Sequence, residues 1–306
     1  MVDKVEKIWF DGELVPWDAA QVHVLTHTLH YGLGVFEGIR CYQLSDGGSA
    51  VFRLDEHVRR FFDSARICTL PMPFTQEQIV AGCLETVRAN KLGECYLRPL
   101  AFVGSGAMGL GARNNPTRVA IVAWKWGAYL GDEGLEHGIR AKVSSYARAG
   151  VNSLMAKGKI VGHYVNSILA KREVLAAGYD EAILLDSQGY VCEASGENIF
   201  VVRDGRVATA PMGSSILGGI TRDTTLRLLR DMGVPVDERT IARDELYIAD
   251  EIFMVGTAAE VTPVREVDDR PVGSGKRGPI SAQLQERYFG AVRGDHVPEE
   301  SWLTRV

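Results

Sequence analysis

Strand-like and helix-like segments alternate along both halves of this chain, on either side of a glycine-rich stretch at residues 127–134. Alternation of this kind is typical of α/β and α+β architectures. Three glycines in eight residues favour a connection between lobes there, and a chain of 306 residues has the length of about two domains. We therefore expect a small N-terminal α/β domain (residues 1–125), an interdomain loop (126–135) and a larger C-terminal domain (136–306).

Local patterns predict the individual elements. Asp11-Gly12 separates two strand-like triplets and predicts a hairpin. Apolar spacing predicts a helix over 54–69, and Thr75 with Gln78 has the capping-box pattern of a helix that runs to about residue 90. Further strands are expected over 95–103, 118–124, 139–145, 181–186, 190–193, 198–203, 206–209 and 251–255, and helices over 162–177, 221–232 and 278–292.

Charge and cysteine content exclude several functional classes. The chain has 34 Lys and Arg against 39 Asp and Glu, a net charge of −5, which argues against nucleic acid as a partner. No apolar run has the length of a membrane span, and the charged residues near the N-terminus argue against a signal peptide. The five cysteines contain no CxxC pair, so we expect reduced thiols in a cytoplasmic protein.

Three motifs resemble ligand sites but fit them poorly. Residues 104–109 read G-x-G-x-x-G, but Pro116 follows too soon for the helix that a dinucleotide site requires, so a flexible loop is favoured. His23 and His27 have the spacing of a metal site, but their surroundings alternate like a strand, so hydrogen-bonded histidines and no metal are expected. Residues 273–276 lack the first glycine of a P-loop and predict a surface turn.

The segment 151–172 contains no Asp or Glu, and Lys157 and Lys159 lie in it between apolar pairs. A lysine that loses water in such surroundings has a lowered pKa, and its free amine can act as a nucleophile. This is the setting of a Schiff-base lysine. The pattern also fits a structural or surface lysine, and on its own it leaves both interpretations open.

Two glycine-containing turns and one glutamate suggest a site for a phosphorylated cofactor. Residues 217–221 lead into a helix whose first N–H groups can bind an anion, and residues 256–259 offer a second group of N–H donors after a strand. Taken singly, each turn is better explained by simple helix capping, but the two turns together with an isolated lysine favour a phosphate site. Glu193 ends a predicted strand, where it could pair with a protonated pyridine nitrogen or lie at a surface bend.

At these residues the chain resembles the class IV aminotransferases, which are fold-type IV pyridoxal 5'-phosphate (PLP) enzymes. Their signature is matched at Glu193, Ser195, Asn198, Ile199, Phe200, Val207, Thr209, Leu217, Gly219, Ile220 and Arg222. Within this class the chain is most similar to the bacterial branched-chain aminotransferases. The matching stretches are residues 29–32, 35–40, 96–100, 126–131, 162–167 and 256–265, and the resemblance extends from Trp9 to Phe289.

The resemblance implies cofactor contacts residue by residue. Lys159 matches the Schiff-base lysine, with Lys157 as its neighbour. Glu193 matches the partner of the pyridine nitrogen, and Tyr164 the tyrosine at the phenolic oxygen. The remaining cofactor contacts implied are Arg60, Ile220, Thr221 and Thr257 around the phosphate and Leu217 against the ring.

The resemblance also implies a substrate pocket for both an aliphatic chain and a carboxylate. Arg98 resembles the residue that receives the glutamate side-chain carboxylate. Tyr96 and the backbone N–H groups of Thr257 and Ala258 resemble the α-carboxylate site. The aliphatic part of the pocket would be lined by Tyr31, often from a neighbouring subunit, and by Phe36, Gly38, Trp126 and Tyr129.

The implied fold is the α/β (α+β) architecture of this family, with two lobes and a β-barrel-like core in the larger one. The implied activity is amino transfer between branched-chain L-amino acids (Leu, Ile, Val) and 2-oxoglutarate. The implied assembly is a homo-oligomer with a dimer as its minimal unit and a hexamer as the larger alternative. Gly218 departs from the Leu-Pro-Gly of many relatives, which bears on cofactor affinity.

Rival activities within the same fold are a D-amino acid or (R)-amine transaminase and an aminodeoxychorismate lyase. They share the lysine, the glutamate and the phosphate site, and they differ in which side of the pocket holds the substrate carboxylate. A rival of another class is a non-catalytic phosphate- or nucleotide-binding protein.

Overall fold

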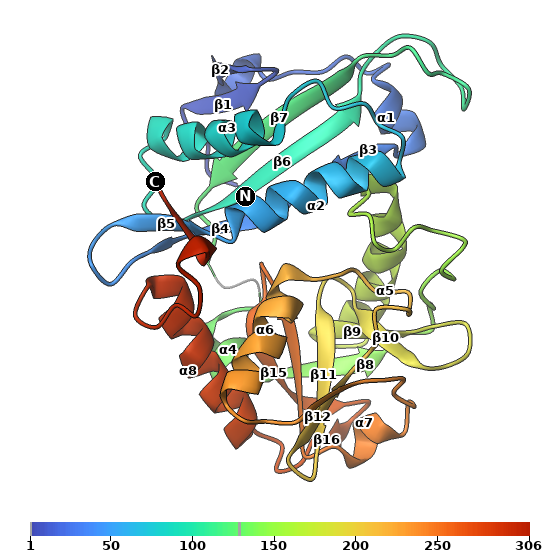
Figure 1. Ribbon diagram of the computed structural model, residues 1–306. Helices are drawn as coiled ribbons and strands as arrows, with labels where there is room; N and C mark the ends of the chain where they lie inside the picture. Colours follow the sequence, from blue (N-terminus) through green and yellow to red (C-terminus); the bar gives the residue numbers. More distant parts are fainter. Residues whose placement is uncertain (1, 128–129) are drawn as a thin grey trace. The chain divides into compact units, whose positions relative to one another are not determined.

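The structure is a computed structural model that describes residues 2–127 and 130–306, and its contacts divide the chain into two compact units (Figure 1). Unit 1 comprises Met1–Trp126, Gly158–His163 and Ala291–Val306. Unit 2 comprises Gly127–Lys157 and Tyr164–Gly290. The chain therefore leaves unit 2 after Lys157 and returns to it at Tyr164. These units are defined by contacts and do not test whether separate domains fold independently. The boundaries expected from the sequence (1–125, 126–135 and 136–306) therefore stay a prediction.

Unit 1 is built on one antiparallel sheet. Its strands are β1 (Lys7–Phe10), β2 (Glu13–Pro16), β3 (Gly34–Phe36), β4 (Ile39–Gln43), β5 (Ser49–Phe52), β6 (Cys95–Val103), β7 (Thr117–Trp124) and β17 (Leu303–Arg305). In the described residues the order is β17-β5-β4-β6-β7-β1-β2, and β3 also pairs with β6. The hairpin expected around Asp11-Gly12 is the β1–β2 pair.

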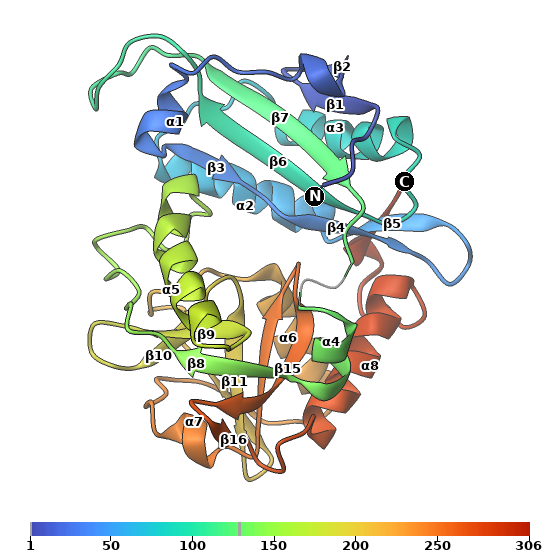
Figure 2. The same cartoon turned by 180° about the vertical axis from the view of Figure 1, so that it is seen from behind.

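Two long helices, α2 (Leu54–Ile67) and α3 (Gln76–Ala89), pack on one face of this sheet (Figure 1), and Figure 2 shows β6 and β7 from the opposite side. Thr75 and Gln78 form the predicted capping box at the start of α3. The core between helices and sheet includes Ile39, Leu54 and Phe61, which are fully buried. Burial of such side chains contributes about 1.5–3 kcal/mol each, so this core holds α2 firmly against β3 and β4. The shorter helices are α1 (His27–Tyr31) and the 3-10 turns Trp17–Ala19, Val161–His163 and Glu300–Trp302.

The strand that borders β6 is interrupted at Glu37-Gly38. Phe36 pairs with Leu100, and pairing resumes with Ile39 opposite Leu97. Between them the Glu37 N–H donates to the carbonyl of Pro99 at 2.8 Å. The register is the same on both sides of this interruption, which falls at residues that the sequence marks as a candidate site.

Unit 2 contains a closed barrel. Its strands are β8 (Ile139–Val143), β9 (Glu181–Leu185), β10 (Val191–Ala194), β11 (Asn198–Arg203), β14 (Glu251–Gly256) and β15 (Glu260–Val267). They pair in the order β10-β9-β8-β15-β14-β11, and β11 pairs again with β10 to close a six-stranded ring. The β-barrel-like core expected for the larger lobe is thereby confirmed. Strands β12 (Arg206–Thr209), β13 (Val236–Glu238) and β16 (Arg270–Pro271) extend this sheet.

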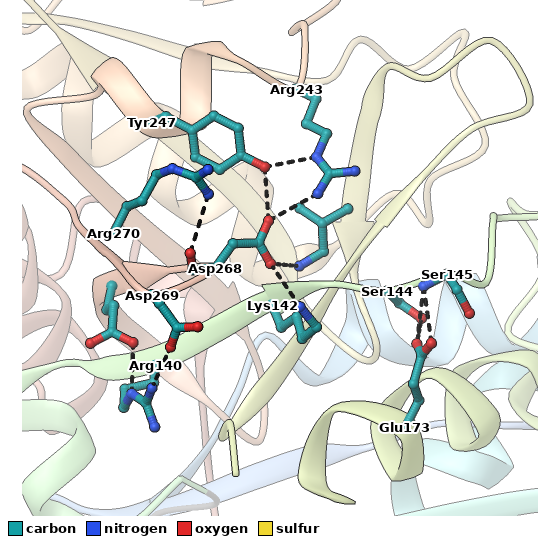
Figure 3. A network of polar contacts seen from close by, with 12 residues as sticks. Arg140, Lys142, Ser144, Ser145, Glu173, Arg243, Tyr247, Asp268, Asp269 and Arg270 are labelled. Atoms are coloured by element: carbon teal, nitrogen blue, oxygen red, sulfur yellow. Dashed lines mark hydrogen bonds and ion pairs between the residues drawn. The ribbon is translucent and has the colours of Figure 1, made fainter. Parts of the chain in front are cut away.

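Polar contacts fix one end of the barrel, as Figure 3 shows. The carboxylate of Asp268, at the β15–β16 turn, accepts hydrogen bonds from the Val143 N–H at 3.1 Å, the Tyr247 hydroxyl at 2.8 Å and the Arg243 guanidinium at 3.0 Å. In the same view Glu173 accepts a hydrogen bond from the Ser145 N–H at 3.0 Å. Glu173 thus anchors the chain where it leaves β8.

The helices of unit 2 are α4 (Asp132–His137), α5 (Tyr164–Ala176), α6 (Ile220–Asp231), α7 (Glu245–Ile248) and α8 (Pro279–Arg293), the last of which ends in unit 1. Because α4 begins at Asp132, the glycine-rich stretch is helical in its last residues. Gly178 and Gly233, which follow α5 and α6, have positive φ angles, as helix-ending glycines do. None of the helices in the described residues is both long enough and apolar enough to cross a membrane.

Candidate functional site

Lys159 lies in the short segment Gly158–His163, which belongs to unit 1 although the residues before and after it belong to unit 2. Its backbone is fixed by α2 and β3: the Lys159 N–H donates to the Ser64 hydroxyl at 2.9 Å, and the Phe36 N–H donates to the Lys159 carbonyl at 3.1 Å. A β-bridge joins the next residue, Ile160, to Val35. The Lys159 Nζ lies 4.9 Å from the centre of the Phe36 ring. The amine therefore stands in a defined position beside an aromatic face.

Arg60 is oriented by a buried carboxylate. Its Nε and one terminal nitrogen donate to the two Glu37 oxygens at 2.7 and 2.8 Å, a fork-like pairing. The His57 Nδ1–H donates to the same carboxylate at 2.7 Å. Burial raises the pKa of Glu37, but the Arg60 and His57 interactions outweigh it and hold that pKa well below its usual range. Burial lowers the pKa of His57, so its imidazole is neutral.

Aromatic rings surround the guanidinium of Arg98. Its central carbon lies 4.8 Å from the ring centre of Phe36, 5.5 Å from that of Tyr96 and 5.6 Å from that of Trp124. The ring centres of Trp126 and Tyr96 lie 4.5 Å apart, and the two rings meet edge to face. The buried Nε of Arg98 has no hydrogen-bond partner among the residues that the structure describes. A cation in aromatic surroundings with an unpaired donor is suited to receive an anion.

Gly38 makes room for the Tyr96 hydroxyl. A Cβ atom at position 38 would lie 1.8 Å from the Tyr96 Oη, which no side chain can tolerate. The structure thus brings together, in unit 1, Lys159 and five residues of the predicted substrate pocket: Phe36, Gly38, Tyr96, Arg98 and Trp126.

In unit 2, Glu193 projects from β10 with its carboxylate fully engaged. Arg148 lies 2.5 Å from Oε1. Oε2 accepts hydrogen bonds from the Leu217 N–H at 3.0 Å and the Asn198 side-chain amide at 3.1 Å. Glu193 is only 5% exposed, so its charge is maintained by these donors.

The turn before α6 has the form of an anion site. The N-cap residue Gly219 provides no side-chain cap, and a Cβ there would lie 2.1 Å from the Asn198 Oδ1. Ile220 and Thr221 form the first turn of α6 and are buried. A 12-residue helix presents N–H groups and a positive dipole end at this point. Leu217 is placed beside Glu193 by the hydrogen bond described above.

The remaining predicted residues of unit 2 lie at the ends of its elements. Thr257 and Ala258 form the turn of the β14–β15 hairpin, which the Gly256–Glu260 pair closes. Tyr164 is the first residue of α5. In unit 1, Tyr31 is 41% exposed on α1 and contacts His27 rather than the Arg98 cluster. Tyr129 lies outside the described residues.

Two more carboxylates of unit 2, those of Glu181 and Glu197, are buried. Glu181 forms an ion pair with Lys171. Glu197 is 4% exposed and accepts a hydrogen bond from the Gly196 N–H at 3.1 Å. Burial, reinforced by the charge of Glu181, raises the pKa of Glu197 to about 8. This carboxyl is therefore largely protonated at neutral pH.

The motifs that fitted ligand sites poorly have structural roles. Residues 104–109 belong to the β6–β7 connection, with no helix after them. His27 contacts the Gly109 carbonyl at 3.0 Å, His30 the Val24 carbonyl at 2.9 Å, and His23 accepts from the Leu25 N–H at 3.1 Å. Residues 273–276 form a turn before α8. Glu251 caps α8 by accepting from the Ile280 and Ser281 N–H groups.

Sequence reasoning missed three residues that orient the site: Glu37, His57 and Arg148. The i, i+3 spacing of His57 and Arg60 places both on one helix face and was the only local signal for the first cluster. Arg148 is far from Glu193 in sequence, and only the fold brings them together.

Comparison with known proteins defines the class. The family described as amino-transferase class IV matches residues 34–267, and the chain belongs to this family.

Individual relatives and solved structures of this family are similar to the chain over nearly its whole length. The chain is 49% identical over 306 residues to the branched-chain-amino-acid aminotransferase of Pseudomonas aeruginosa, covering 100% of this chain and 99% of the relative. The crystal structure of the Escherichia coli branched-chain amino acid aminotransferase has a TM-score of 0.96 at 46% identity, with 98% and 99% of the two chains covered. The T.th. branched-chain amino acid aminotransferase complexed with N-(5'-phosphopyridoxyl)-L-glutamate has a TM-score of 0.92 at 47% identity, with 98% of each chain covered.

Proposed function

We propose that this chain is a PLP-dependent transaminase that moves the amino group between branched-chain L-amino acids and 2-oxoglutarate. The observation that carries the proposal is the placement of Lys159. Its amine is held beside Phe36, whose ring also faces the Arg98 guanidinium. The names of the full-length relatives and the pyridoxyl-glutamate ligand of one neighbour support the same reaction.

The residues present fit the cofactor. Glu193 offers a buried carboxylate for a protonated pyridine nitrogen. The α6 N-terminus at Ile220 and Thr221 offers N–H groups for a phosphate, without a side-chain cap from Gly219 in the way. PLP, when bound, supplies an electron sink for the carbanion formed at the substrate Cα. The further contacts that we propose are Arg60 and Thr257 at the phosphate, Leu217 against the ring and Tyr164 at the phenolic oxygen.

Lys159 would have two roles: its amine holds the cofactor covalently in the resting enzyme, and once released it moves a proton to or from the substrate Cα. General acid–base catalysis of this kind contributes about 10²–10⁴-fold. The two backbone hydrogen bonds of Lys159 and the β-bridge of Ile160 hold the backbone in place, so the Lys159 side chain extends from a fixed position.

Two kinds of substrate must use one pocket. The rings of Phe36 and Trp126 suit a branched aliphatic chain, whereas Arg98 has an unpaired buried Nε that suits the side-chain carboxylate of glutamate. We place the α-carboxylate at Tyr96 and the backbone of Thr257 and Ala258. Tyr31 and Tyr129 complete the proposed pocket.

We further propose a cytoplasmic homo-oligomer. All five cysteines are free thiols, which suits a reducing compartment. Large apolar side chains are exposed on unit 1, where Leu110 is 91% and Val24 69% exposed, and on α5 of unit 2, where Val165 is 60% exposed. Exposed apolar side chains mark an interaction surface where they gather into one patch, and we propose that those on α5 do so between subunits. A dimer is the smallest assembly proposed, and a hexamer is the larger alternative.

A substrate panel tests the activity. Purified protein with PLP and 2-oxoglutarate should turn over L-Leu, L-Ile and L-Val, and Lys159→Ala should reduce each rate by more than about 100-fold. Lys276→Ala, at an exposed turn, is the matched control and should behave as the wild type. Faster turnover of D-Ala or of a simple chiral amine would instead favour one of the other transaminases of this fold.

A further inference from the structure

Lys157 is the last residue of unit 2 before the chain crosses to Lys159. Its Nζ donates to two backbone carbonyls, that of Ser214 at 3.0 Å and that of Ile216 at 2.8 Å. The proposed catalytic role of Lys159 makes no use of these contacts. Lys157 is exposed, so they do not follow from burial in a core.

The loop that Lys157 contacts is held by side-chain donors at four consecutive carbonyls. Lys157 takes those of Ser214 and Ile216, Arg148 Nε donates to that of Ser215 at 3.4 Å, and the Asn198 amide donates to that of Leu217 at 3.1 Å. Two glycines, residues 218 and 219, follow before α6. Since glycine restricts the backbone less than any other residue, these side-chain donors, together with the buried Ile216 side chain, hold the loop in place.

The same loop is joined to Glu193. The Leu217 N–H and the Asn198 amide both donate to Glu193 Oε2, and Arg148 lies against Oε1. Although Lys157 is exposed as a whole, its amine is partly covered at the Ile216 carbonyl. This partial loss of water lowers the pKa of Lys157, and the nearby Glu193 charge opposes that shift. Movement of residues 214–217 would therefore disturb the donors that keep Glu193 charged.

Lys157 also fixes the start of the segment that carries Lys159. Upstream, the segment is anchored where Ser145 donates to Glu173 (Figure 3) and where the Arg148 N–H donates to the Leu185 carbonyl at 2.8 Å. Downstream, Lys159 itself is anchored in unit 1. Lys157 is the last tether in unit 2, two residues before the amine.

We propose that Lys157 is a positioning residue that ties the origin of the Lys159 segment to the 214–217 loop and thereby holds Leu217 and Glu193 for the cofactor. The inference rests on the proposed function for its cofactor, but the tether itself belongs to the cofactor-free chain.

The test compares Lys157→Ala, Lys157→Arg and the control Lys276→Ala. Because Lys157 is exposed, its truncation opens no core cavity, and unfolding of each cofactor-free variant by urea checks the fold. In cofactor-free protein, the Leu217 amide should exchange its hydrogen about tenfold faster in Lys157→Ala than in wild type, the change expected when a charge-assisted hydrogen bond is lost. Arginine can donate to both carbonyls and should restore slow exchange.

In the loaded enzyme, Lys157→Ala should release PLP about tenfold faster than wild type and should shift the pH dependence of the visible absorption spectrum. Lys157→Arg should stay close to the wild type in both measurements. The control Lys276→Ala should match the wild type. Wild-type rates of Leu217 exchange and PLP release in Lys157→Ala would overturn the inference. If wild-type protein binds no PLP, the proposed function fails, and the exchange experiment still decides whether the tether exists.

Discussion

Removing the charge of Glu37 tests how the Arg60 side of the site is built. Glu37 is 0% exposed and accepts hydrogen bonds from Arg60 at 2.7 and 2.8 Å and from His57 at 2.7 Å. In Glu37→Gln one oxygen becomes an amide that cannot accept these bonds, and the Arg60 charge loses its counterion. Breaking a buried pair costs about 3–5 kcal/mol. Because the Arg60 side chain is 13% exposed, we expect the lower end, a loss of about 3 kcal/mol in unfolding free energy.

The assay is urea unfolding of the cofactor-free protein, followed by circular dichroism. Asp237→Asn is the control, because Asp237 pairs with Arg206 at 3.0 Å and the two side chains are 44% and 58% exposed, so its loss should be below about 1 kcal/mol. A Glu37→Gln loss no larger than that of Asp237→Asn would refute the reasoning.

The pH dependence of the Glu37 effect has a defined sign. The pKa of Glu37 is lowered in the folded protein, so its stabilising contribution is fully present above the ordinary carboxyl pKa and is lost as pH falls through the folded value. The difference between wild type and Glu37→Gln should be constant near neutral pH and should shrink in acid.

Three further predictions concern individual residues. Gly38→Ala places a Cβ against the Tyr96 hydroxyl and should raise the KM for leucine, whereas Gly111→Ala, in open space, should not. Glu197 has a raised pKa of about 8, so folding opposes its ionisation, and the stability of Glu197→Gln relative to wild type should increase from about pH 4.5 to 8 in urea unfolding. Arg98→Gln should slow turnover with 2-oxoglutarate at least about tenfold more than turnover with an aliphatic 2-oxo acid, and equal losses in steady-state kinetics would contradict the assignment.

The elements with strong local signals could be predicted from the sequence. The capping box of α3 and the β1–β2 hairpin were identified because adjacent residues determine them. Strand β15, which contains Pro263, was not among the predicted strands. The closure of the barrel by β10 with β11 could be expected only from the family resemblance.

The residues of the candidate site likewise differ in whether the sequence alone identifies them. Lys159 and Glu193 stand in segments with a recognisable signature, whereas the partners that orient them, Ser64 and Arg148, come from distant parts of the chain. Glu37 was not singled out in the sequence, because its role depends on its contacts with His57 and Arg60 of α2. Contacts between residues far apart in sequence carry no local pattern, so the supporting residues required the fold.

The central claim is that Lys159 carries the cofactor, and reductive trapping tests it most directly. The protein, loaded with PLP, is reduced with borohydride, digested and analysed by mass spectrometry. The account predicts a yellow protein before reduction, a pyridoxyl group on Lys159 afterwards and complete loss of transamination. A label on another lysine such as Lys157, or an active protein with no label at all, would contradict it.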